Sequence, residues 1–159
     1  NGNLIVSGNL TICSDLNIEN GNIIVSGILN ATEDADINIS GGDISCGSLD
    51  CSDININDGD IWVNGILNAG NITSDGNIEV GVDAHVVDIT CLNYLISRDN
   101  YSADIKAYQD IYILGTNHSW ALNAREILIG WHCKTLGNSI TAHHFVCGGE
   151  LSCRGLFID

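Results

Sequence analysis

The chain has 159 residues, a length typical of a single domain, and 45% of them are hydrophobic, which is enough for a continuous core. Its formal net charge of −15, from 20 acidic and five basic residues, argues against binding to nucleic acid or to an anionic membrane. No apolar run reaches the length of about 18 residues that a membrane-spanning helix needs.

The first half of the sequence repeats one short pattern. The pattern is Asp-Leu/Ile-Asn-Ile, a polar turn, and a second strand that opens on Gly-Asn or Gly-Asp; copies start at Asp15, Asp36 and Asp53. A repeat of about 20 residues built from short alternating strands predicts a β-solenoid. The opening glycine recurs at spacings of 19, 21, 17 and 17 residues, at Gly2, Gly21, Gly42, Gly59 and Gly76.

Apolar residues that alternate with polar ones predict three short strands per coil, beginning with Leu4–Val6, Leu10–Ile12 and Leu16–Ile18. A single coil cannot bury its own apolar face, but coils stacked about 4.8 Å apart in parallel form one dry column. The outward positions Asn17, Asn38 and Asn55 match between coils and predict an amide ladder.

The second half keeps the pattern with more changes. We expect an irregular segment at residues 82–103, whereas 148–153 closely matches 41–46. The sequence therefore predicts one all-β domain over 1–159, a parallel β-solenoid of about eight short coils. In it, regular repeats give way to degenerate repeats from residue 82 onward.

Seven cysteines are many for a reducing compartment, and the odd count leaves at least one of them free or paired between chains. Cys46 and Cys51 lie five residues apart across one corner, and Cys147 and Cys153 lie six apart across another. We expect disulfides at these corners, although the connectivity is not fixed by the sequence. Cys13, near the N-terminal edge, is the candidate for an interchain bond.

Asn-x-Ser/Thr sequons are in mild excess, which favours an exported protein, although asparagine and threonine are also abundant in turns. The candidate glycosylation sites are Asn9, Asn30, Asn38, Asn71, Asn100 and Asn117.

The sequence predicts no catalytic, cofactor-binding or metal-binding residues. Four of the five histidines lie near three cysteines in the last third, but their spacing matches no zinc motif. The acidic corners lack the glycine-rich calcium repeat. Basic residues recur at no repeat interval and no nucleophile motif is present, so we do not expect an enzyme. Trp62, Trp120 and Trp131 either stack on sugar rings or fill corners and subunit contacts.

Two known groups are similar to this sequence. The short Gly-Asn-Leu-x-Val-x-Gly patterns of residues 1–80 resemble bactofilins, intracellular bacterial polymer-forming proteins with a parallel β-helix core. The Gly/Asn/Ile-rich repeats, several cysteines and strong acidity more closely resemble the sheath proteins of filamentous methanogenic archaea. That second resemblance implies an extracellular, self-assembling, non-catalytic wall component cross-linked by disulfides.

The two ends of the sequence complement each other. Joined end to start they read Ile-Asp-Asn-Gly-Asn-Leu-Ile-Val, which repeats the internal corner 18–25 with conservative changes. Because an open edge strand recruits other strands, we expect a head-to-tail homopolymer. The competing explanation is that these 159 residues were cut from a longer solenoid, which would leave the same uncapped ends. The predicted function is a structural protein of a cell sheath or surface filament, and the alternative is a surface adhesin or glycan-binding β-helix module. The predicted polymer interface consists of Leu4, Ile5, Val6, Leu156, Phe157 and Ile158.

Overall fold

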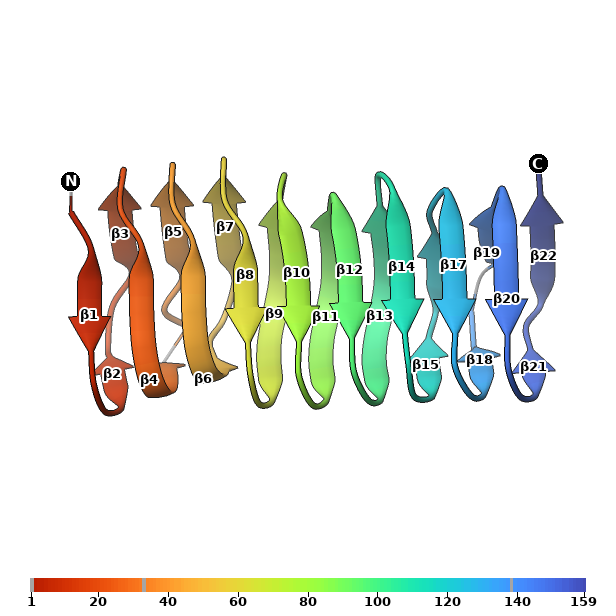
Figure 1. Ribbon diagram of the computed structural model, residues 1–159, viewed down its shortest axis with the longest axis horizontal. Helices are drawn as coiled ribbons and strands as arrows, with labels where there is room; N and C mark the ends of the chain where they lie inside the picture. Colours follow the sequence, from red (N-terminus) through yellow and green to blue (C-terminus); the bar gives the residue numbers. More distant parts are fainter. Residues whose placement is uncertain (1, 33, 138) are drawn as a thin grey trace.

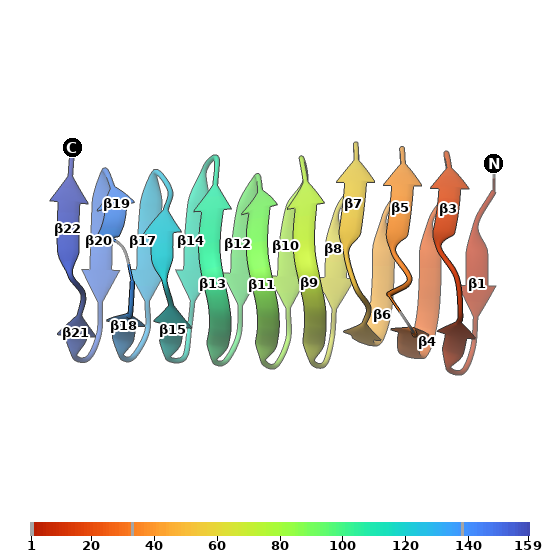
Figure 2. The same cartoon turned by 180° about the vertical axis from the view of Figure 1, so that it is seen from behind.

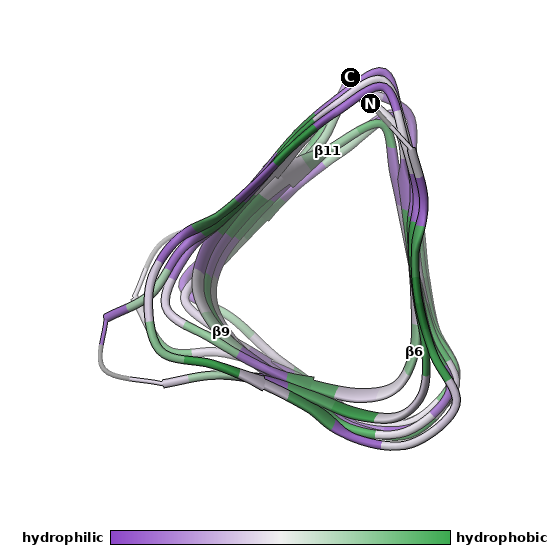
Figure 3. Ribbon diagram, turned by 90° about the vertical axis from the view of Figure 1, so that its left-hand side faces the viewer, coloured by the Kyte–Doolittle hydropathy of each residue, from purple (hydrophilic) through white to green (hydrophobic). Residues whose placement is uncertain are grey.

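The computed structural model describes residues 2–32, 34–137 and 139–159, and these form a single column of parallel β-strands without a helix. The coils are stacked along one axis, with the two chain ends at opposite ends of the column (Figure 1, and from behind Figure 2). Viewed along the axis, each coil is a triangle (Figure 3). The predicted parallel β-solenoid is confirmed, and the described residues form about nine coils where about eight were predicted.

The 22 strands of the described residues lie on three faces of this triangle. The first face holds β1 (Leu4–Val6), β4 (Ile23–Ala31), β6 (Ile44–Asp50), β8 (Ile61–Val63), β10 (Asn77–Val80), β12 (Asn93–Ile96), β14 (Asp110–Ile113), β17 (Glu126–Ile129) and β20 (His144–Cys147). The second face holds β2 (Leu10–Ile12), β9 (Leu67–Ser74), β11 (Ala84–Cys91), β13 (Asn100–Ala107), β15 (Asn117–Ser119), β18 (Cys133–Thr135) and β21 (Leu151–Ser152). The third face holds β3 (Leu16–Glu19), β5 (Ile37–Ser40), β7 (Ile54–Asn57), β16 (Ala121–Asn123), β19 (Ser139–Ala142) and β22 (Gly155–Ile158). The longer strands bend round a corner: β4 and β6 continue onto the second face, and β9, β11 and β13 continue onto the third.

Strand pairing places like residues in columns that run along the axis. On the first face, Leu4 pairs with Ile23, and Ile23 pairs with Ile44. Side chains of a strand alternate between its two faces, so every second position of each strand points inward. Ile23 and Ile44 have no exposed surface. The core is thus one continuous aliphatic column.

Residues 82–103, for which we expected an irregular structure, are regular. β11 pairs in parallel with β9 at six positions and with β13 at seven. The sequence is misleading here because β11 turns a corner in mid-strand. Val86 is buried, but the next two residues, Val87 and Asp88, are both exposed, which interrupts the period of two.

The corners are closed by polar side chains that accept a backbone N–H from the next coil. The Asp36 N–H donates to Asp15 Oδ1 at 3.0 Å, and the Asp53 N–H donates to Asp36 Oδ1 at 3.1 Å. At a second corner the Asp43 N–H donates to Asn22 Oδ1 at 2.9 Å. These bonds satisfy backbone groups that a turn would otherwise leave without a partner, which explains why Asp and Asn recur there.

The repeating glycine is required by close contact between coils. A Cβ added to Gly21, Gly42, Gly59 or Gly76 would collide with the carbonyl oxygen of the glycine in the preceding coil. Positive φ is a separate reason that applies elsewhere, at Gly41 with a φ of 73°. The spacing of these glycines in the sequence therefore equals the number of residues per coil.

Replacing one stacked glycine by alanine tests this contact. Gly59→Ala forces backbone apart within the column, so we expect it to lower the free energy of unfolding by about 1–3 kcal/mol or more. Gly8→Ala is the matched control, because nothing lies within 4 Å of its added Cβ, and we expect a change of about 0.5 kcal/mol or less. Urea unfolding followed by circular dichroism measures both, and equal losses would contradict the steric explanation.

Candidate functional site

Inward residues of the first and last coils are more exposed than their neighbours in the same columns. Leu4 is partly exposed, whereas Ile23, its neighbour in the same column, has no exposed surface. At the other end Leu156 is 42% exposed, although its column neighbour Ile140 is fully buried. Figure 1 shows β1 and β22, which carry all six residues of the predicted polymer interface, at opposite ends of the column.

The backbone at these two ends has a defined direction. Inward residues donate their N–H to the following coil, as Leu4 does to the Asn22 carbonyl and Leu16 to the Asp36 carbonyl, both at 2.8 Å. Because a parallel ladder alternates, outward residues such as Ile5 direct their N–H to the preceding coil. β1 pairs with β4 and β22 pairs with β19, so the N–H of Ile5 points away from the second coil and the N–H of the inward residue Leu156 points away from the preceding coil.

The predicted amide ladder is confirmed on the third face. Asn38 Nδ2 donates to Asn17 Oδ1 at 3.1 Å, and Asn55 Nδ2 donates to Asn38 Oδ1 at 3.0 Å. These asparagines come from β3, β5 and β7, which lie side by side in Figure 2. The ladder links the first three coils from outside.

A second asparagine ladder, which the sequence analysis did not predict, lies inside the column. Asn100 Nδ2 donates to Asn117 Oδ1 at 2.9 Å, and neither residue has exposed surface. The Tyr94 hydroxyl donates to Asn100 Oδ1 at 2.8 Å, and the Ser102 hydroxyl donates to the same atom at 2.9 Å. Asn117 also donates to the Ser119 hydroxyl at 2.9 Å. Polar side chains thus replace the aliphatic residues that fill this column in earlier coils.

This interior ladder corrects two of the glycosylation predictions. Asn100 and Asn117 are buried, and their amide nitrogens are used as hydrogen-bond donors, so the folded column cannot carry a glycan there. Their sequons arise because the inward side of a strand recurs every two residues and both inward residues are polar. Of the other candidates, Asn9 and Asn71 are exposed, whereas Asn30 and Asn38 are partly buried.

The cysteines are free thiols throughout, so the bridges predicted at Cys46–Cys51 and Cys147–Cys153 are not present. Cys46 points inward on β6, and Cys51 lies just past the end of that strand. A strand rises about 3.3 Å per residue, so five steps exceed the Cα separation of about 5.5 Å that a disulfide requires. Cys147 is the last residue of β20 on the first face, whereas Cys153 follows β21 on the second face. Cys13 is exposed at the first coil.

Burial sets the acidity of the interior thiols. It raises the pKa of Cys46, Cys91 and Cys133 to about 12. Burial is also the main cause for Cys51, whose pKa is raised to about 12 with further contributions from the neighbouring Asp50, Asp53 and Asp36. Since the thiolate is the reactive form, these residues are poor nucleophiles and act as small apolar side chains.

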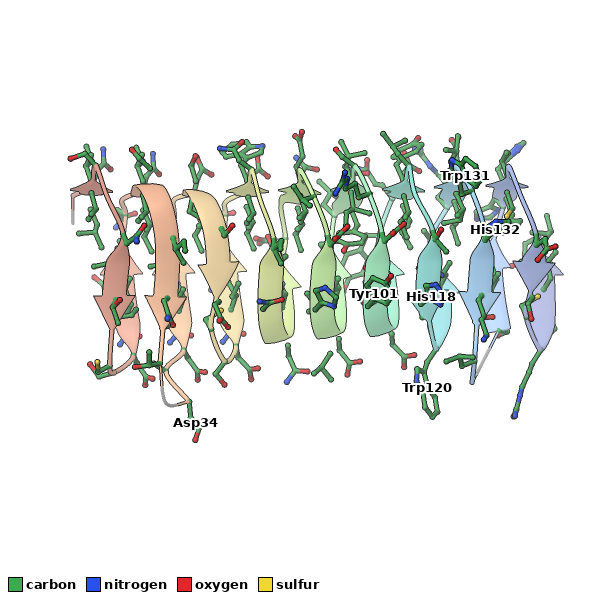
Figure 4. All side chains as sticks on the ribbon, turned by 90° about the horizontal axis from the view of Figure 1, so that it is seen from below. Asp34, Tyr101, His118, Trp120, Trp131 and His132 are labelled. Carbon is green, nitrogen blue, oxygen red and sulfur yellow. The ribbon has the colours of Figure 1, made fainter. Side chains whose placement is uncertain are left out.

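Aromatic rings form a third ladder, on the outside of the second face. His85, Tyr101 and His118 occupy one outward column in β11, β13 and β15. Their ring centroids are 4.9 and 5.1 Å apart, and successive ring planes lie within 5° of parallel. Lys134 continues the column in β18. Figure 4 shows Tyr101 and His118 in the middle of this face and Trp120 at its lower edge.

A shallow groove of about 420 Å³ runs beside the rings. It separates the ladder from Trp120 and Leu136, which lie at the corner between the second and third faces and are 55% and 51% exposed. The other two tryptophans lie elsewhere, Trp62 on the first face and Trp131 at the corner between the first and second faces. The three tryptophans therefore do not form a common site.

Within residues 2–32, 34–137 and 139–159, no group of three or more His, Cys, Asp or Glu side chains is placed to hold one metal ion. The same residues contain no helix that is long and apolar enough to cross a membrane. No protein-family model, curated protein or solved structure matches this chain. Its function therefore has to be inferred from its own residues and fold.

The interior ladder should stabilise the column more than the exterior one does. Asn117→Ala leaves the Asn100 amide donor buried without a partner, and we expect a loss of about 1–3 kcal/mol for each group left unpaired. Asn38→Ala is the matched control at an outward ladder position, where water replaces the lost bonds, so we expect a smaller loss. Urea unfolding of both variants checks this, and an equal or larger loss for Asn38→Ala would contradict it.

The buried thiols predict a loss of stability at alkaline pH. Their folded pKa values of about 12 exceed the ordinary value of 9.0, so folding favours the protonated form. This contribution is complete below pH 9 and is lost as the pH rises from there towards 12. We expect the thermal midpoint, followed by circular dichroism, to fall through this window.

Two variants assign that slope to the thiols. Cys91→Ala removes one buried titrating group and should show a shallower fall in thermal midpoint than the parent. Cys13→Ala removes an exposed thiol and should keep the parent slope. The explanation fails if Cys91→Ala and the parent decline equally between these pH values.

Proposed function

We propose that this protein is an extracellular structural component that assembles with itself, coil upon coil, into a sheath or surface filament. The observation that carries the proposal is the repetition of one parallel register along the column, in which every internal coil buries the same side-chain columns and uses the same kinds of backbone donor towards its two neighbours. A second copy stacked on either edge would bury the same columns that each internal coil already buries.

Geometry favours a head-to-tail contact. In the first coil the outward residue Ile5 directs its N–H along the column axis, and in the last coil the inward residue Leu156 directs its N–H the opposite way. Every internal junction joins the same two kinds of residue in parallel register. Such a contact is heterologous and regenerates its own edge, so it propagates along the axis instead of closing as a dimer.

The distribution of charge along the chain also favours head-to-tail stacking over the stacking of like ends. Residues 1–84 contain 13 of the 20 acidic residues and no Lys, Arg or His, whereas residues 85–159 contain seven acidic and all five basic residues. The two parts thus carry formal charges of −13 and −2. Head-to-tail stacking places the strongly acidic end against the weakly charged one. Stacking of two N-terminal ends would oppose two strongly acidic surfaces.

An exterior location is part of the proposal. The exposed sequon asparagines Asn9 and Asn71 can be modified during export without disturbing the interior of the column. The acidic surface keeps separate copies soluble before they assemble.

Proline at the two free N–H groups tests the head-to-tail contact. Ile5→Pro and Leu156→Pro each remove one outward-pointing donor from an edge strand, a position where a missing N–H is tolerated. We expect the parent to form filaments in electron micrographs and each variant alone to sediment as a monomer, since all its copies lack the same edge. An equimolar mixture should yield dimers, because each mixed pair has one intact edge of each kind.

Ile5→Thr is the control, since it changes the same exposed side chain but keeps the N–H, and it should assemble as the parent does. A parent that remains monomeric at all concentrations would overturn the proposed function. Dimers formed by Ile5→Pro alone would instead show that like edges pair with like, against the head-to-tail arrangement.

A further inference from the structure

The ring ladder and the groove beside it form one surface, which we call the aromatic groove. It runs along the column axis on the second face and lies on the side of the column, away from the first and last coils. It consists of His85, Val87, Tyr101, His118, Trp120 and Leu136.

We propose that the aromatic groove binds a neutral, linear polysaccharide laid parallel to the column axis, with Trp120 against a sugar ring and the stacked rings supplying hydrogen bonds.

The exposed apolar surface of the groove is not required by the fold. Trp120 is 55% exposed, Val87 54%, Leu136 51% and Tyr101 42%. In the first four coils the outward column that the ring ladder occupies holds small polar or acidic residues, Thr11, Asn30, Asp50 and Asn68. A contiguous apolar strip with a polar rim is typical of a binding surface.

The two sides of the groove offer the two chemistries that a pyranose ring presents. Trp120 provides an aromatic surface for the apolar face of a sugar, and Gly137 leaves room for the indole, because a Cβ there would collide with it. The rings of the ladder cover one another's faces, so their edges point outward. Those edges carry the Tyr101 hydroxyl and the imidazole nitrogens of His85 and His118, which donate to and accept from hydroxyl groups.

The spacing of the ladder suits a polymer. Successive rings are 4.9 and 5.1 Å apart, which is about the length of one sugar unit in an extended β-1,4-linked chain. Each sugar unit along the groove would therefore meet one polar ring edge. A compact ligand would not use this repetition.

Charge and backbone pairing exclude other polymers. The chain carries a net charge of −15, and exposed Asp88 and Asp104 follow the groove at the corner, so an anionic glycan is disfavoured although Lys134 continues the ring column. An extended peptide normally binds by pairing with a free strand edge. The groove offers none, because β11 and β13 are paired on both sides.

Calorimetric titration with cellohexaose and chitohexaose, two neutral β-1,4-linked hexasaccharides, tests the proposal. The parent should bind at least one of them, with a change in tryptophan fluorescence. Trp120→Ala should weaken binding by about tenfold or more, as expected when a central aromatic contact is lost. Tyr101→Phe keeps the stacked ring, removes only the hydroxyl, and should also weaken binding. Trp131→Ala is the control, since this tryptophan is 63% exposed at another corner, and it should bind as the parent does.

Three results would overturn the proposal: no binding of either hexasaccharide by the parent, tighter binding of an anionic oligogalacturonate, or equal loss of binding in Trp131→Ala and Trp120→Ala. The measurement is repeated on Ile5→Pro, which keeps the aromatic groove and lacks one edge N–H. Sugar binding and assembly are thereby measured separately, so a negative result for one proposal does not decide the other.

Discussion

The parallel backbone ladder between neighbouring coils is the constraint on which the rest of this structure depends. It places each side chain above its counterpart in the preceding coil. Each column therefore favours a residue type that stacks well on another residue of the same type. Isoleucine does this in the core, asparagine on the third face and glycine at one corner. The repetitive sequence is a direct consequence of this self-contact.

Carboxylates are the residues for which such stacking is least favourable, because like charges directly opposite one another repel. The column nevertheless places Asp15, Asp36 and Asp53 in one row. Each pair is joined by a hydrogen bond from the backbone N–H of one coil to the carboxylate of the coil before it. A hydrogen bond to the charged form offsets the repulsion, and it makes the acidic corner part of the structure as well as a source of surface charge.

The two halves of the column differ in how strongly they fix their register. In the first coils the inward columns are aliphatic, and neighbouring coils resemble one another closely. In the later coils Tyr94, Asn100 and Asn117 form a specific hydrogen-bonded network in which each polar group needs its own partner. A shift of the strand pairing by one coil would leave buried polar atoms without a hydrogen-bond partner. The later coils therefore specify their pairing register more strongly than the first coils do.

Ends and sides of the column present different chemistry. The first and last coils carry inward aliphatic side chains in the same columns as the internal coils, whereas the sides expose side chains that the ladder holds in rows. The proposed assembly and the proposed sugar binding therefore use different surfaces. The change from small polar residues to aromatic rings along the second face occurs in the half of the chain that also contains all the basic residues and histidines.

The sequence by itself determined the solenoid, its three strands per coil and the amide ladder of Asn17, Asn38 and Asn55, because period-two alternation and glycine spacing are local signals. The tertiary structure decided which side each residue faces once a strand turns a corner. Val87 thereby became exposed, Asn100 and Asn117 became buried in spite of their sequons, and residues 82–103 became regular. It also brought His85, Tyr101 and His118 into one stack, although they are 16 and 17 residues apart in the chain. Coil lengths vary between neighbouring repeats, so only the realised pairing register shows which distant residues lie on top of one another.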